Sequence, residues 1–120
     1  MLDEPDVLAF LDARPVFPGH VLVVPRVHYD TLPDLPVPLL STLFEAVQRM
    51  SVAVPEAMHA DGTFVGINNV VSQSVPHLHV HVVPRVRKDG LRGFFWPRQK
   101  YESDDAMVAV AQAIRAALVR

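Results

Sequence analysis

Three histidines alternate with aliphatic residues near the middle of the chain, in the order His77-Leu78-His79-Val80-His81. Successive side chains of a β-strand point to opposite faces, so a strand here places the three imidazoles on one side and the aliphatic residues on the other. Neighbouring rings then start about 6.6 Å apart, given a rise of roughly 3.3 Å per residue. The sequence therefore predicts a row of imidazoles backed by a buried apolar face.

A row of imidazoles supports two chemistries. Neutral imidazoles bind zinc or copper, but three in a straight row rarely converge on one ion, so a metal site needs a further ligand such as His20, His28 or a carboxylate. Alternatively, one imidazole acts as a nucleophile, for example in phosphoryl transfer, while its neighbours orient it and manage protons. A third interpretation is that the histidines have no functional role, and the residues around them disfavour it.

The flanking residues fit nucleophilic chemistry. Gln73 and Ser74 stand just before the histidines and supply neutral hydrogen-bond donors for an oxyanion or a bridging oxygen. From Arg85 to Lys100 the chain carries six basic residues against one acid. This segment either attracts phosphates or forms a solvated loop. Within it, the cluster Phe94-Phe95-Trp96 could cover a ligand, pack across a dimer interface or belong to the core.

Apolar periodicity predicts the elements that position these residues. We expect strands at 7–11, 20–25, 63–68 and 77–83, the second of them buried on both faces. A helix is expected over 39–58, closed by Asp61-Gly62. A second helix begins after Ser103, whose hydroxyl caps it ahead of two acidic residues. Two strands and a helix, then two strands and a helix, predict an α+β fold with a mainly antiparallel sheet and one long helix.

Length and composition limit the class of protein. At 120 residues, we expect a single domain over 1–120, with a net charge of −2. The absence of cysteine excludes disulfides and thiolate metal sites. The chain shows neither a signal-peptide pattern nor an apolar run long enough for a membrane span, which favours the cytoplasm and no membrane partner. A nucleic-acid partner is not expected, because no wide basic surface or known motif is visible.

Two blocks of the sequence resemble a known family. They are Asp12-Ala13-Arg14-Pro15-Val16-Phe17-Pro18-Gly19-His20-Val21-Leu22-Val23-Val24-Pro25 and Gln73-Ser74-Val75-Pro76-His77-Leu78-His79-Val80-His81-Val82-Val83-Pro84-Arg85. Their order and spacing are similar to the histidine triad (HIT) family of nucleotide hydrolases and transferases. The resemblance covers about residues 7–85 and leaves 86–120 as a basic loop and a C-terminal helix. It implies a HIT-like fold and a homodimer.

The resemblance also implies roles for the residues of the second block. His79 matches the nucleophile that attacks the α-phosphorus, and His77 matches the histidine that supports the triad through hydrogen bonds. His81 matches the histidine near the scissile phosphate and the leaving group. Gln73 matches a residue that touches the phosphate or the bridging oxygen, and Ser74 a hydroxyl near the leaving group.

Other matches fall outside the triad. His20 matches a histidine that contacts the first triad member, and Asp12 a residue that binds the ribose hydroxyls. Asn69 or Asn68 matches an asparagine near the phosphates. Ser72 stands where many members have a glycine, a residue that tolerates positive φ far better than serine does.

The implied activity is hydrolysis of a nucleoside 5′-phosphoryl bond through a covalent nucleotidyl-histidine, with release of a nucleoside monophosphate such as AMP. Dinucleoside polyphosphates and adenosine phosphoramidates are the candidate substrates. No metal is required for the covalent step, and Mg²⁺ could accompany a polyphosphate. Two alternatives stay open: a metal-binding module that uses the three histidines, and a nucleotide-binding regulatory protein with little turnover.

Overall fold

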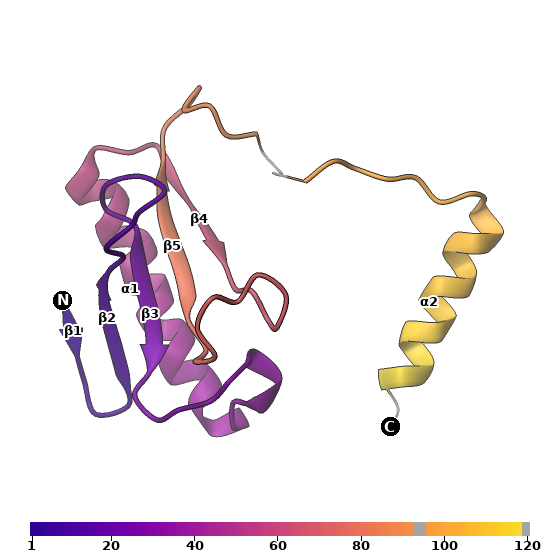
Figure 1. Ribbon diagram of the computed structural model, residues 1–120, viewed down its shortest axis with the longest axis horizontal. Helices are drawn as coiled ribbons and strands as arrows, with labels where there is room; N and C mark the ends of the chain where they lie inside the picture. The colour runs from indigo at the N-terminus through magenta and orange to yellow at the C-terminus, as the bar shows by residue number, and fades with distance from the viewer. Residues whose placement is uncertain (93–95, 119–120) are drawn as a thin grey trace. The chain divides into compact units, whose positions relative to one another are not determined.

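The computed structural model describes residues 1–92 and 96–118. Its strands form one five-stranded antiparallel sheet in the order β1-β2-β3-β5-β4 (Figure 1). The elements are β1 (Leu2–Asp3), β2 (Val7–Leu11), β3 (Val21–Pro25), the 3-10 turns η1 (Leu32–Asp34) and η2 (Val37–Leu39), α1 (Leu40–Met58), β4 (Gly62–Gly66), β5 (Val80–Arg85) and α2 (Asp104–Leu118). This architecture confirms the predicted α+β class with a mainly antiparallel sheet.

Helix α1 covers one face of the sheet (Figure 1). Its apolar stripe, spaced at helical intervals, packs on the alternate residues of the strands that face it. The core comprises Leu43, Ala46, Val47, Met50 and Val54 of α1 with Val7, Ala9, Val21, Val23, Leu35, Leu78, Val80 and Val82. Within Met1–Asp89, α1 is the one long helix. The opposite face of the sheet therefore has no helix over it in this unit.

The histidine segment departs from the predicted strand at both ends. β5 begins at Val80 rather than His77, with Val80 opposite Val23 of β3. Before that point, the Leu78 N–H donates to the carbonyl of Tyr29 (2.6 Å). β5 then continues through Pro84, beyond its pairing with β3, against β4 alone. The alternation nevertheless holds, since Leu78, Val80 and Val82 are fully buried.

α1 ends at Met58, as expected, and His59 rather than Asp61-Gly62 closes it, in a left-handed backbone conformation (φ 53°). Two other features differ from expectation. β4 ends at Gly66 rather than at residue 68. β3 is not buried on both faces throughout, since Leu22 is half-buried and faces the open side of the sheet.

The chain divides into two compact units, Met1–Asp89 and Gly90–Arg120. In the second unit, Ser103 caps α2 as predicted, and its Oγ accepts the Ala106 N–H (3.0 Å). Of the cluster at 94–96, Phe94 and Phe95 lie outside the described residues, and Trp96 is exposed. Among the described helices, none combines the length and the apolarity that crossing a membrane requires. The prediction of a single domain over 1–120 stays a prediction.

Candidate active site

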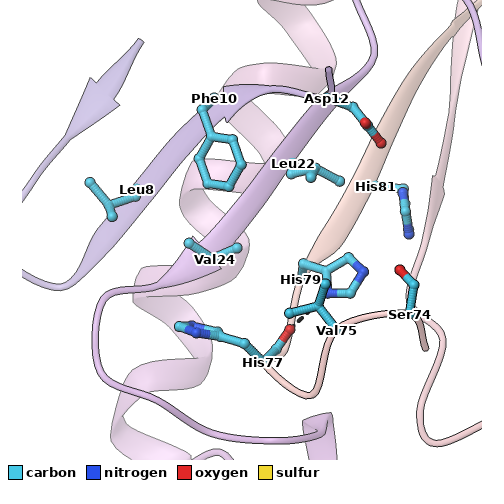
Figure 2. A pocket seen from close by; sticks show the side chains of 10 residues that line it. All are labelled: Leu8, Phe10, Asp12, Leu22, Val24, Ser74, Val75, His77, His79 and His81. Carbon is cyan, nitrogen blue, oxygen red and sulfur yellow. Dashed lines mark hydrogen bonds between the residues drawn. The ribbon is translucent and has the colours of Figure 1, made fainter. Parts of the chain in front are cut away.

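A pocket of about 440 Å³ opens on the face of the sheet that α1 does not cover (Figure 2). Antiparallel register builds it: Phe10 lies opposite Leu22, and Leu22 lies opposite His81, so three strands present side chains to the same face. The lining residues are Leu8, Phe10, Asp12, Leu22, Val24, Ser74, Val75, His77, His79 and His81. All three histidines of the HxHxH segment therefore meet at one pocket.

The tautomer of His79 follows from its hydrogen bond. Its Nδ1 lies 2.7 Å from the backbone carbonyl of His77, which can only accept, so Nδ1 carries the proton (Figure 2). In the neutral ring, Nε2 then keeps its lone pair. His79 as a whole is only 9% exposed. Because His77 Nε2 likewise donates to the Pro25 carbonyl (2.9 Å), the neighbouring ring is fixed as well.

A second hydrogen-bond chain fixes His81. The Val16 N–H donates to His20 Nδ1 (3.1 Å), so the proton of neutral His20 is on Nε2, which donates to His81 Nδ1 (2.9 Å). Neutral His81 therefore carries its own proton on Nε2. His20 thus contacts the third triad histidine rather than the first, which corrects the expectation from the resemblance. The register explains this, because Leu22 pairs with His81 and His20 is its diagonal neighbour.

Local structure places His20 and Asp12 side by side. The chain turns at Gly19 (φ 96°), where a Cβ would lie 2.5 Å from Met58 Cγ, and the His20 N–H closes the turn on the Phe17 carbonyl (3.0 Å). The Asp12 N–H then donates to the His20 carbonyl (2.9 Å). As a result, Asp12 Oδ2 lies 3.8 Å from His20 Nδ1.

Burial favours the neutral forms of His20 and His81. Desolvation lowers the pKa of His81, and the nearby His79 and His20 lower it further, against a smaller opposing effect of Asp12. Desolvation likewise lowers the pKa of His20, with Asp12 opposing. Neutral imidazoles are the state in which each ring both donates and accepts, as the hydrogen-bond chain requires.

These shifts predict a pH dependence of stability. Unfolded histidines take up protons below about pH 6.5, whereas folded His20 and His81 do so only at lower pH, so the unfolded state binds more protons in that window. The free energy of unfolding should therefore decrease as the pH falls below 6.5. Urea titrations between pH 7.5 and 5 measure this. His20→Gln should weaken the pH dependence; an unchanged dependence would contradict the assignment.

Asp12, His20 and His81 also form a possible metal-ligand group, with one ligand atom from each within 4.8 Å of the others. The hydrogen bonds argue against an ion there. A metal on His20 Nε2 would move the proton of the neutral ring to Nδ1, where the Val16 N–H already points. By contrast, the hydrogen bond that His20 Nε2 donates to His81 Nδ1 is compatible with the Val16 N–H at His20 Nδ1.

The other predicted site residues divide into two groups. Ser74 and Asp12 line the pocket with the triad. Gln73, Asn69 and Asn68 are not among the residues that line it. Asn69 Oδ1 accepts the Leu32 N–H (2.8 Å), and both ends of the Gln73 amide bond to backbone groups of Val70 and Asp30.

Sequence reasoning missed the apolar part of the pocket and one histidine contact. Leu8, Phe10, Leu22 and Val24 form an apolar wall beside the histidines, and their period-two spacing in two paired strands is the signal that could have found them. His28, named above as a possible further metal ligand, is exposed and packs edge-on against His77, with ring centroids 5.1 Å apart. Its partner is Asp30 (2.6 Å).

Arg85, the first basic residue of the segment from Arg85 to Lys100, forms an ion pair with Asp89. The Arg85 guanidinium donates two hydrogen bonds to the Asp89 carboxylate, at 2.5 and 3.0 Å, in a largely buried pair. The bidentate pair therefore sets the positive charge of Arg85 against the negative charge of Asp89, the one acid of the segment. The remaining charge of the segment belongs to the residues from Arg87 to Lys100.

The fold and the site define a class: an antiparallel α+β domain with a histidine-lined pocket on its open face. A family model described as HIT domain matches residues 1–88. The chain is 41% identical over 85 residues to an uncharacterized HIT-like protein of Saccharolobus solfataricus, covering 69% of this chain and 61% of that protein. It is 37% identical over 83 residues to the asymmetrical bis(5′-nucleosyl)-tetraphosphatase of Schizosaccharomyces pombe, covering 68% and 46%.

A solved structure agrees with these matches. The crystal structure of a HIT family member from Bacillus subtilis has a TM-score of 0.85 and 28% identity, covering 97% of this chain and 84% of that one. The chain therefore belongs to the HIT family. It spans less than two thirds of the length of the two curated relatives.

Proposed function

We propose that this protein hydrolyses nucleoside 5′-phosphoryl compounds and releases a nucleoside monophosphate, most simply AMP. The observation that carries this proposal is the orientation of His79, whose Nδ1–H is bound to the His77 carbonyl so that Nε2 offers its lone pair. A nucleotide hydrolase among the relatives supports it, since the matched Schizosaccharomyces pombe protein is a bis(5′-nucleosyl)-tetraphosphatase.

The proposed reaction has two steps. His79 Nε2 attacks the α-phosphorus, a P–N bond forms, and the bond from phosphorus to the leaving group breaks, with the electron pair departing on the leaving group. Neutral His81 donates a hydrogen bond from its Nε2–H to that group, which takes up any proton it needs from solvent water. Water then attacks the nucleotidyl-histidine, the P–N bond breaks with its electron pair returning to His79 Nε2, and the proton lost by the water passes to solvent as the monophosphate is released.

The lining of the pocket suggests where each part of the nucleotide binds. The apolar wall of Leu8, Phe10, Leu22 and Val24 suits a flat base, with the edge or face of Phe10 against it. Asp12, beside that wall, suits the ribose hydroxyls as an acceptor. Ser74, on the loop side, suits the leaving group. The phosphate then lies between them, near His79.

Two substrate classes fit this arrangement, dinucleoside polyphosphates and adenosine phosphoramidates. The covalent step uses only the side chains of the chain, and Mg²⁺ would serve to neutralise a polyphosphate substrate rather than the protein. Incubation with a panel of both classes, with separation of the products, tests the proposal. Release of AMP from at least one class is expected; nucleotide binding without turnover of any would favour a regulatory protein.

We also propose that the protein is a homodimer. β4 is an edge strand of the sheet, and such an edge is a template for pairing with another chain. Apolar side chains are exposed on β4 and α1, at Val65, Phe44 and Val52. Light scattering at micromolar concentration should give twice the mass of the 13.3 kDa chain. A monomeric mass would contradict this prediction.

A further inference from the structure

We propose that Gln73 is a positioning residue that latches a strained loop in place, and not a ligand of the phosphate. The loop is residues 69–74, called the 69–74 loop below. Its last residue, Ser74, lines the pocket. This inference rests on the proposed hydrolysis for its kinetic consequences, while the latch itself is a property of the folded chain.

The 69–74 loop holds two residues in a conformation that L-amino acids avoid. Val70 has φ 72° and Ser72 has φ 62°. For a β-branched residue such as valine, a positive φ is an outlier, and serine also prefers negative φ. Val70 and Ser72 are exposed, so burial of their side chains does not compensate for this strain. The loop therefore needs other contacts to hold this shape.

The side chain of Gln73 supplies such contacts. Its Oε1 accepts the Val70 N–H (2.9 Å), and its Nε2 donates to the carbonyl of Asp30, which lies 43 residues earlier in the chain. One amide thus joins the strained residue to a separate segment. Asn69 reinforces the junction through the Leu32 N–H (2.8 Å).

The position of Gln73 favours a role in holding the loop over direct contact with the substrate. Gln73 is not among the residues that line the pocket, whereas Ser74, the next residue, is. Both functional groups of its amide are already engaged, and turning the side chain toward a phosphate would leave the Val70 N–H without this acceptor. Loss of Gln73 should therefore act on the reaction through the position of Ser74.

The backbone strain of the 69–74 loop allows an experiment that distinguishes a positioning role of Gln73 from direct contact with the phosphate. Glycine tolerates positive φ, so Val70→Gly with Ser72→Gly removes the strain that the latch opposes. Gln73→Ala should lower kcat/KM about tenfold, and adding the two glycine substitutions should recover at least fivefold of that loss. If Gln73 instead contacts the phosphate, the glycines should give no recovery, which would overturn the proposal. Gln48→Ala, at an exposed glutamine of α1, is the matched control.

Amide hydrogen exchange tests the latch without any turnover. In the wild-type protein the Val70 N–H should be protected, and Gln73→Ala should speed its exchange at least tenfold while the amides of β5 remain unchanged. Equal exchange in both proteins would overturn the latch even if activity changed. Conversely, an inactive wild-type protein with a protected Val70 amide would contradict the proposed hydrolysis and leave the latch supported.

Discussion

His79→Ala should abolish formation of a covalent nucleotide adduct and lower kcat/KM by roughly 10⁴-fold or more, since a nucleophile cannot be replaced by the remaining residues. The physical reason is the single lone pair at Nε2, which the His77 carbonyl secures by binding the proton on Nδ1. Intact-protein mass spectrometry after a rapid quench in alkaline denaturant measures the adduct, because a phosphorus–imidazole bond is labile in acid. The wild-type protein should gain the mass of one nucleotidyl group.

Two comparisons make this result specific. His79→Ala should still bind AMP, because the apolar wall and Asp12 do not depend on the ring. His59→Asn is the matched control: His59 is an exposed histidine in the left-handed conformation at the end of α1, which asparagine tolerates, so adduct and rate should not change. An adduct of normal yield in His79→Ala would show that another residue is the nucleophile.

His20→Leu should lower kcat/KM by about 10–100-fold, the effect of losing a hydrogen bond in a buried network. Leucine can neither accept the Val16 N–H nor donate to His81, so His81 is free to take the other tautomer. Because His20 does not line the pocket, the loss should appear in kcat and leave the affinity for AMP nearly unchanged.

His20→Gln distinguishes positioning from packing. The oxygen and nitrogen of a glutamine amide are separated by one carbon, like the two ring nitrogens, so Oε1 can accept from Val16 while Nε2 donates to His81. Activity within about fivefold of wild type is expected, since hydrogen bonds of the same kind are kept. If leucine and glutamine were equally damaging, or equally harmless, His20 would not act through the tautomer of His81. Melting temperatures of both variants report any general loss of stability.

Much of the fold was predictable because the relevant signals are local. Alternation at Leu78, Val80 and Val82 marks a buried strand face, since the period of two is a property of the extended backbone itself. The helical spacing of Leu43, Val47 and Met50 places α1 for the same kind of reason. Strand ends were less accurate: the Leu78 N–H bonds to the Tyr29 carbonyl and not to β3, and β5 begins at Val80 rather than where the residue pattern begins.

For the site, the sequence predicted which residues take part, but not which hydrogen-bond partners their side chains have. The residue types and spacing of the HxHxH segment, with the two motif blocks, pointed to His79 and to Asp12, and both line the pocket. The side-chain amide of Gln73, which the resemblance matches to a residue that touches the phosphate, donates to the Asp30 carbonyl, and its contact with a phosphate stays a prediction. Sequence similarity carries over a residue type, whereas the partner of its side chain depends on the segment packed beside it.

By itself, the sequence determined which side chains could do chemistry and which face of their strand they share, because steric alternation along a backbone needs no distant partner. Only the tertiary structure decided how protons are arranged among them. His20 and His81 are 61 residues apart and meet through strand register, and the backbone amide of Val16 then sets both tautomers. A hydrogen bond across strands depends on the pairing of the whole sheet, and no local pattern encodes it.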